Sequence, residues 1–147
     1  MISFIIRMTP DMGTVIAGIA GDIKAAELFA MTKTVMVGER EIKAEEPVRT
    51  GNLVNSTQGD VIDGLNGVIK ITAPYGKYVY EGTGIYGPHG TPIVPVTAKA
   101  LFWPGAPHPF RSVKGQKPNR FIDRALIPWN PQGTYENAVT EYLAGHR

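Results

Sequence analysis

The chain has 147 residues and lacks cysteine, and no apolar run in it approaches the length of a membrane span. Without cysteine there are no disulfides, thiolate metal sites or cysteine nucleophiles. A membrane-spanning helix needs about 20 consecutive apolar residues, and the apolar run Phe4–Ile6 is too short for the core of a signal peptide. We therefore expect a soluble protein that stays in the cell that makes it and does not enter a membrane.

Side chains that carry chemistry are few and scattered. His89 and His108 have no aspartate or glutamate close by in the sequence, and none of the serines lies in a Gly-x-Ser-x-Gly turn. The Gly82–Gly84 segment lacks the Lys-Ser/Thr ending of a phosphate-binding loop. Asp60 and Asp63 flank an expected hairpin, where a turn role explains Asp63. We expect no enzymatic activity, no metal and no cofactor.

Composition and length favour one folded domain, residues 1–147. Hydrophobic residues make up 43% and charged residues 19% of the chain, close to globular averages. The net charge is only +2, but bases dominate from Lys99 to Arg124 and acids from Glu39 to Glu46. Opposite patches suit contact with copies of the same chain or with charged neighbours, and two solvated faces would explain them equally well.

Hydrophobic periodicity predicts an alternation of strands and helices. The expected elements are a strand over 2–7, a helix from Thr14 to about Ala44, a hairpin over 57–71, short helices over 75–82 and 119–126, and a final helix from Thr134. Gly38 is the expected break in the long helix, and Thr50 the expected cap of a helical turn. The fold class is α+β: a long N-terminal helix and C-terminal helices packed on a small, mostly antiparallel β-sheet.

The expected core combines the helix after residue 119 with the hairpin and neighbouring turns. Its members are Phe121, Ile122, Ala125, Leu126, Leu53, Ile69, Ile71, Tyr78 and Val79. Truncating such side chains should lower stability by about 2 to 5 kcal/mol.

A long loop or arm, at about 84–118, is rich in proline and glycine and contains a strand-like island from Ala98 to Trp103. Long loops of this kind are more often functional than decorative. Aromatic and basic side chains alternate along it, and we predict that they contact a neighbouring subunit or partner. The candidates are Phe102, Trp103, Phe110, Arg111, Lys114 and Lys117. Stacking on nucleic-acid bases is the less favoured interpretation of the same residues.

Four segments in a fixed order resemble the tail-completion, or head-tail joining, family of the neck of long, non-contractile-tailed bacteriophages. The matching segments are Val48–Ser56 (with Thr-Gly-x-Leu-x-x-Ser), Ala73–Thr83, Pro88–Pro95 leading to Lys99–Phe102, and Lys117–Leu126. The resemblance covers about residues 14 to 126.

The resemblance implies a structural virion protein that forms a ring, commonly of six copies, around the DNA channel at the head-tail junction. It implies head-closure or connector proteins and the tail terminator or tail tube as partners, with DNA passing through the ring. The chain would be assembled in the host cytoplasm and reside in the virion. A tail-terminator ring at the same junction and a nucleic-acid-binding module that uses the basic loop remain the alternatives.

Overall fold

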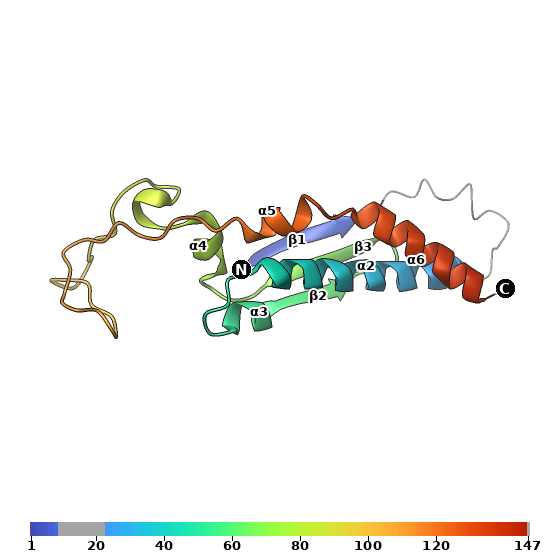
Figure 1. The fold of residues 1–147 in the computed structure, drawn as a ribbon, viewed down its shortest axis with the longest axis horizontal. Coiled ribbons are helices and arrows are strands. Elements are labelled where there is room, and N and C mark those ends of the chain that lie inside the picture. The colour runs from blue at the N-terminus through green and yellow to red at the C-terminus, as the bar shows by residue number, and fades with distance from the viewer. Residues whose placement is uncertain (9–22, 147) are drawn as a thin grey trace. The chain divides into compact units, whose positions relative to one another are not determined.

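The computed structural model describes residues 1–8 and 23–146, which combine helices with an antiparallel sheet (Figure 1). The chain divides into two compact units. We call Met1–Ala73 together with Phe121–Arg147 the body, and Pro74–Arg120 the arm. The α+β class predicted from the sequence is confirmed, with the long helix and the C-terminal helices packed on the sheet.

Three antiparallel strands form the sheet in the order β1-β3-β2. They are β1 (Ile2–Arg7), β2 (Thr57–Val61) and β3 (Asn66–Ile71). The predicted first strand and hairpin are confirmed. The Asp63 carboxylate shapes the hairpin turn by accepting the backbone N–H groups of Leu65 and Asn66 at 2.8 and 2.9 Å, as expected of a turn aspartate.

Helix α2 (Ile23–Glu45) covers one face of the sheet and fits it through glycines. A Cβ atom at Gly59 would lie 2.4 Å from Cγ1 of Val35, and one at Gly67 would lie 2.3 Å from its Cγ2. Val35 therefore occupies the space that two neighbouring strands leave by having no side chain at these positions. The predicted N-terminal part of this helix, from Thr14, lies outside the described residues.

The predicted break at Gly38 is wrong, because α2 continues without interruption through this residue. Gly38 is buried, and a Cβ atom there would lie 2.6 Å from the Trp129 ring and 2.9 Å from Cδ1 of Ile69. The glycine costs about 1 kcal/mol in helix propensity. The close packing of the Trp129 and Ile69 side chains against Gly38 compensates for this cost.

The remaining helices of the body are α3 (Asn52–Ser56), α5 (Phe121–Leu126) and α6 (Pro131–Gly145). Both α5 and α6 pack against α2. The Phe29 and Tyr142 rings meet at 5.4 Å between α2 and α6, and Arg124 pairs with Glu45 at 2.9 Å between α5 and α2. The body is thus a sheet, one long helix on it, and two helices against that helix.

The last helix begins earlier than the sequence indicated. It starts at Pro131, not at Thr134, and its N-cap is Asn130, whose Oδ1 accepts the Gly133 N–H at 3.0 Å. Proline suits the first helical position, since its missing N–H would have no partner there.

Most of the predicted core is confirmed. Six of its members are buried: Leu53, Ile69, Ile71, Phe121, Ile122 and Ala125. Leu126 and Val79 are half-buried. The prediction that Tyr78 belongs to the core is wrong, because its side chain is 60% exposed on a short helix of the arm.

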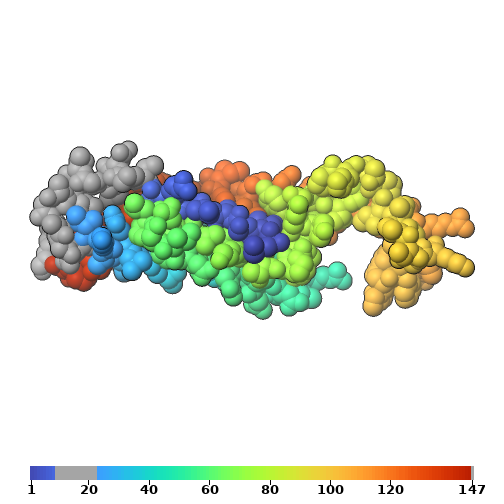
Figure 2. Space-filling model, turned by 180° about the vertical axis from the view of Figure 1, so that it is seen from behind, coloured from blue at the N-terminus to red at the C-terminus, as the bar shows by residue number. Residues whose placement is uncertain are grey.

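Figure 2 shows the side of the molecule on which β1, in blue, lies at the surface beside the green strands of the hairpin. The sheet face turned away from α2 carries mostly polar side chains. Because side chains alternate along a strand, the residues next to Gly59 and Gly67 point to this face. Asp60 and Lys70 pair here at 3.3 Å, and both are well exposed. Ile5 on β1 is a large apolar side chain on this face, and it is 59% exposed.

We expect the Gly67→Ala substitution to lower the free energy of unfolding by about 1 to 3 kcal/mol, since the added methyl would collide with Val35. Chemical denaturation measures this change. Gly145→Ala is the control, because nothing lies within 4 Å of a Cβ at that position. A Val35→Ala change should recover part of the loss in the double variant; strict additivity would contradict the proposed fit.

Candidate functional site

The arm begins with helix α4 (Gly76–Glu81), followed by the single 3-10 turn η1 (Gly84–Tyr86). Gly82 ends α4 in the left-handed region, with φ of 82°, and its N–H donates to the Tyr78 carbonyl at 2.9 Å. The short helix and its glycine stop, both predicted from the sequence, are confirmed. A left-handed glycine is a common helix terminator because it has no Cβ to clash.

From α4 onwards the arm consists of two chain segments held together by backbone hydrogen bonds. These bonds run between Val79 and Asn119, Thr83 and Gln116, Ile85 and Lys114, Ile93 and Val113, and Leu101 and Phe110. In the Ile93–Val113 pair and in the Leu101–Phe110 pair, the N–H of each residue donates to the carbonyl oxygen of the other, at 2.7 to 3.0 Å. The Pro/Gly-rich stretch is therefore an irregular hairpin, with its tip at residues 102–109.

Glycine is required where the two segments come closest. Gly84 and Gly115 both have positive φ, 63° and 91°. A Cβ at Gly84 would lie 2.1 Å from the Lys114 carbonyl oxygen, and one at Gly115 would lie 2.1 Å from that of Thr83. The base of the hairpin is thus a backbone-to-backbone contact that admits no side chain.

The predicted strand over Ala98–Trp103 is wrong. Within this segment only Leu101 forms a bridge, with Phe110 on the returning segment. Three prolines at the tip, Pro104, Pro107 and Pro109, have no N–H to offer a ladder. A single bridge is what remains of the strand.

The three predicted aromatic residues lie at the tip, and the structure brings two of them together. The Trp103 and Phe110 rings stack at 5.3 Å between centroids with 12° between their planes. The His108 ring also contacts the Phe110 ring, at 4.2 Å between centroids. Phe102 does not join them and is 67% exposed, while Trp103 is 45% exposed. The tip therefore presents apolar rings to its surroundings.

The predicted basic residues follow on the returning segment, and Arg111, Lys114 and Lys117 are all exposed. Lys117 lies 5.9 Å from the Tyr86 ring and Arg120 lies 4.7 Å from the Tyr80 ring, which are cation–π distances. The arm has six basic residues against the acid Glu81, a net charge of +5. Since the whole chain has +2, the body carries −3.

Neither a metal-binding cluster nor a membrane-spanning helix is found in the part of the chain that the structure describes. Across residues 1–8 and 23–146, no three histidine, aspartate or glutamate side chains gather to hold a metal ion. The same residues contain no helix both long and apolar enough to cross a membrane. His108 contacts its own neighbour, with Nδ1 3.1 Å from the Pro109 carbonyl oxygen.

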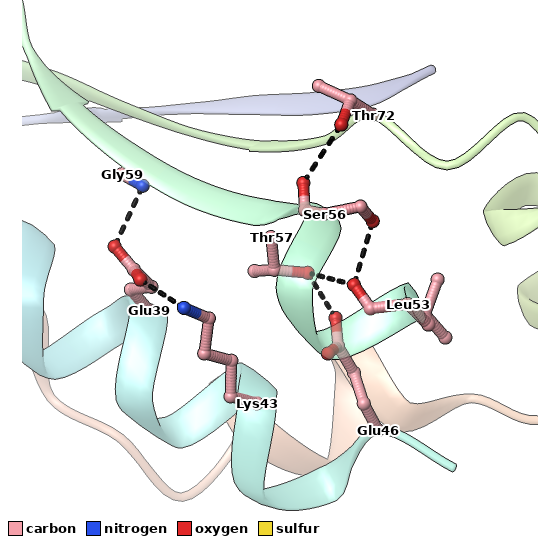
Figure 3. Close-up of polar contacts among 8 residues, drawn as sticks. All are labelled: Glu39, Lys43, Glu46, Leu53, Ser56, Thr57, Gly59 and Thr72. Atoms are coloured by element: carbon pink, nitrogen blue, oxygen red, sulfur yellow. Dashed lines mark hydrogen bonds and ion pairs between the residues drawn. The ribbon is translucent and has the colours of Figure 1, made fainter. Parts of the chain in front are cut away.

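Glu46 is a buried acid that sequence reasoning missed, and its contacts are shown in Figure 3. It follows the end of α2, and its Oε1 accepts the Thr57 hydroxyl at the start of β2. Its Oε2 is buried without a hydrogen-bond partner. Burial raises the pKa of the Glu46 carboxyl, against the opposing effects of the Thr57 hydrogen bond and the Lys43 charge. Nothing in its position before Pro47 signals burial.

The contacts between the end of α2 and the start of β2, which we call the Glu46 junction, also give the Thr50–Ser56 segment a structural role. Thr50 was expected to cap α3, but the N-cap is Gly51, at φ of 77°, and no side chain caps the helix. Leu53 is buried, and the Ser56 hydroxyl donates to the Leu53 carbonyl at 2.7 Å (Figure 3). On the other side, Glu39 accepts the Gly59 N–H at 2.9 Å and pairs with Lys43. The Glu46 junction thus ties α2 to α3 and β2, and its acid is structural.

We expect Glu46→Gln to raise the free energy of unfolding at neutral pH. The folded-state pKa of Glu46 is raised above 4.5, so its protonated form favours folding, and that contribution is lost as pH rises through the folded-state pKa. The advantage of the variant should shrink as pH falls towards 4.5. Denaturation between pH 4 and 8 measures it, with the exposed Glu136→Gln as control; a less stable variant at pH 7 would show that the carboxylate stabilises the fold.

We expect Gly84→Ala to open the base of the arm without unfolding the body. The methyl would collide with the Lys114 carbonyl, so the Thr83 and Ile85 amides should exchange hydrogen faster. Gly90→Ala is a matched control, because Gly90 has a similar φ of 62° but nothing within 4 Å. It should cost only backbone strain, about 1 to 2 kcal/mol. Equal exchange in both variants would mean that strain, not close approach, determines the effect.

The candidate site is therefore the arm, with its exposed aromatic tip and its basic returning segment. Comparison with protein-family models, with curated proteins and with solved structures finds no match for this chain. A function for it has to be argued from its own residues.

Proposed function

We propose that this chain is a structural ring component at the head-tail junction of a tailed bacteriophage, where it joins or completes the tail. The observation that supports this most is the arm tip, which exposes the Phe102 and Trp103 side chains. Large aromatic side chains exposed together mark protein-protein contact surfaces, in which they act as anchors. The four ordered segments that resemble the tail-completion family favour the head-tail junction as the location of the ring.

The charge distribution supports contact between unlike surfaces of identical copies. The arm carries +5 and the body −3, so an arm of one copy is attracted to the body of another. Such contacts are heterologous, and they close into a ring when the rotation between copies allows it. A ring of six copies around the DNA channel is the arrangement that the resemblance implies.

The arm is also suited to binding because little of it has to be ordered on contact. Backbone hydrogen bonds already join its two segments from Val79–Asn119 to Leu101–Phe110. Prolines at the tip restrict the backbone further. Both features reduce the conformational entropy that association would otherwise remove.

Nucleic-acid binding is a second candidate, and the net charge of +5 on the arm favours it. Exposed lysine and arginine side chains neutralise phosphates, and aromatic rings stack on bases. This function would be active in a monomer. Its affinity would fall steeply as the salt concentration rises.

We expect Trp103→Ala to prevent ring assembly while leaving the folding of the body intact. Losing an aromatic anchor typically costs about 2 kcal/mol or more per contact, at least roughly thirtyfold in association. Light scattering and negative-stain imaging, alone and with the neighbouring neck proteins, measure the assembly. Ile62→Ala is the control, since this side chain is also exposed, by 59%, but lies at the hairpin turn of the body.

Two outcomes would contradict the proposal. The unaltered chain could stay monomeric with every neck partner, and salt-sensitive DNA binding by that monomer would then favour the second candidate. Alternatively, rings could form equally well with Trp103→Ala, which would remove the aromatic tip from the contact.

A further inference from the structure

A pocket of about 450 Å³ lies in the body between α2, the segment before α6, and α6 itself. Its lining residues are Val37, Arg40, Glu41, Pro128, Trp129, Asn130, Gly133, Thr134 and Asn137. All of them belong to the body. This volume is within the range of pockets that hold small ligands or a few side chains.

The indole of Trp129 is fixed in this pocket from two sides. Its ring lies next to Gly38 of α2, which has no side chain to displace it. Its Nε1–H donates to the Thr134 hydroxyl at 3.1 Å. A ring held in this way loses little freedom when a ligand stacks on it.

The rest of the lining combines apolar surface with hydrogen-bond donors and one acid. Val37 and Pro128 add apolar surface beside the indole. Arg40 and Asn137 carry N–H donors, and Glu41 pairs with Arg40 at 2.9 Å. A fitting ligand offers apolar rings, free carbonyl oxygens and a positive charge.

The arm tip has this chemistry. Pro104, Pro107 and Pro109 are apolar and have no N–H, and their carbonyl oxygens can accept hydrogen bonds. Trp103 stacks on Phe110 beside them, and Arg111 follows directly. Proline-rich segments are commonly bound by grooves that contain a tryptophan.

We propose that the Trp129 pocket of one copy binds the proline-rich arm tip of a second copy. A second copy is the favoured occupant because the arm is positive, the body is negative and Glu41 lies in the lining. The tip prolines stack on Trp129, Arg40 donates to tip carbonyls, and Arg111 approaches Glu41. This inference rests on the proposed ring function and names the surface that receives the arm.

The absence of cysteine allows a direct test by disulfide crosslinking. Two full-length single-cysteine proteins are mixed, Ala106→Cys at the tip and Asn137→Cys in the pocket, and mild oxidant is added. Only contact between different molecules can join the two, because neither contains both cysteines. Disulfides form only when the two Cα atoms lie within about 7 Å.

The matched control replaces Asn137→Cys with Asp60→Cys, on the exposed sheet face turned away from α2. We expect at least about tenfold more crosslinked heterodimer with the pocket cysteine, since docking raises the effective concentration of the two thiols. Arg40→Ser in the pocket protein should reduce this yield, because it removes donors to the tip.

A second measurement uses no cysteine. In Trp103→Phe the tip remains aromatic and Trp129 is the one remaining tryptophan. Its quenching by acrylamide should decrease as the protein assembles, because the tip covers the indole. This readout tests the proposal even if a cysteine variant folds poorly.

The outcomes separate this inference from the proposed function. Assembly with selective crosslinking and protection of Trp129 supports both. Rings that form with equal crosslinking to positions 60 and 137, and with Trp129 still accessible, would overturn the docking site but retain the ring function. A chain that never assembles overturns both.

Discussion

Val35, lying where Gly59 and Gly67 have no side chains, sets how closely α2 approaches the sheet. The rest of the body depends on this spacing. With α2 at this depth, Gly38 is brought against Ile69 of the sheet and Trp129 of the segment before α6. Glycines at three positions thus let α2 pack closely against the sheet and against the segment before α6. Gly38 also determines where the Trp129 indole lies in its pocket.

Polar contacts then fix the ends of the closely packed elements. Glu46 and Thr57 join the end of α2 to β2, and Tyr135 of α6 donates to the Gly64 carbonyl in the hairpin turn at 2.9 Å. The arm departs from this body after buried Ala73, and the chain returns at buried Phe121. Phe102, Trp103 and Phe110 lie at or next to the tip of the arm, far in sequence from these fixed ends. The arrangement combines a well-packed body with an arm whose apolar rings remain exposed, as the association between copies that we propose requires.

The candidate site was partly visible in the sequence. Alternating aromatic and basic residues pointed to residues 102–117, and the structure gathers Trp103 and Phe110 at the tip of the arm. The pairing of the two segments was not visible, because it depends on backbone hydrogen bonds between glycine- and proline-rich stretches with no regular alternation. The Trp129 pocket escaped notice for a similar reason: its lining comes from α2 and from residues about ninety positions later.

Local chemistry alone predicts several elements of this protein: the first strand, the hairpin with its Asp63 turn, the Gly82 helix stop and the α+β class. These follow from side-chain alternation, turn residues and glycine conformation, all of which act over a few residues. The role of Gly38, the burial of Glu46 and the exposure of Tyr78 depend on the folded arrangement instead. Each depends on which distant segment lies opposite, since a glycine that weakens an isolated helix becomes necessary when Trp129 and Ile69 pack against it.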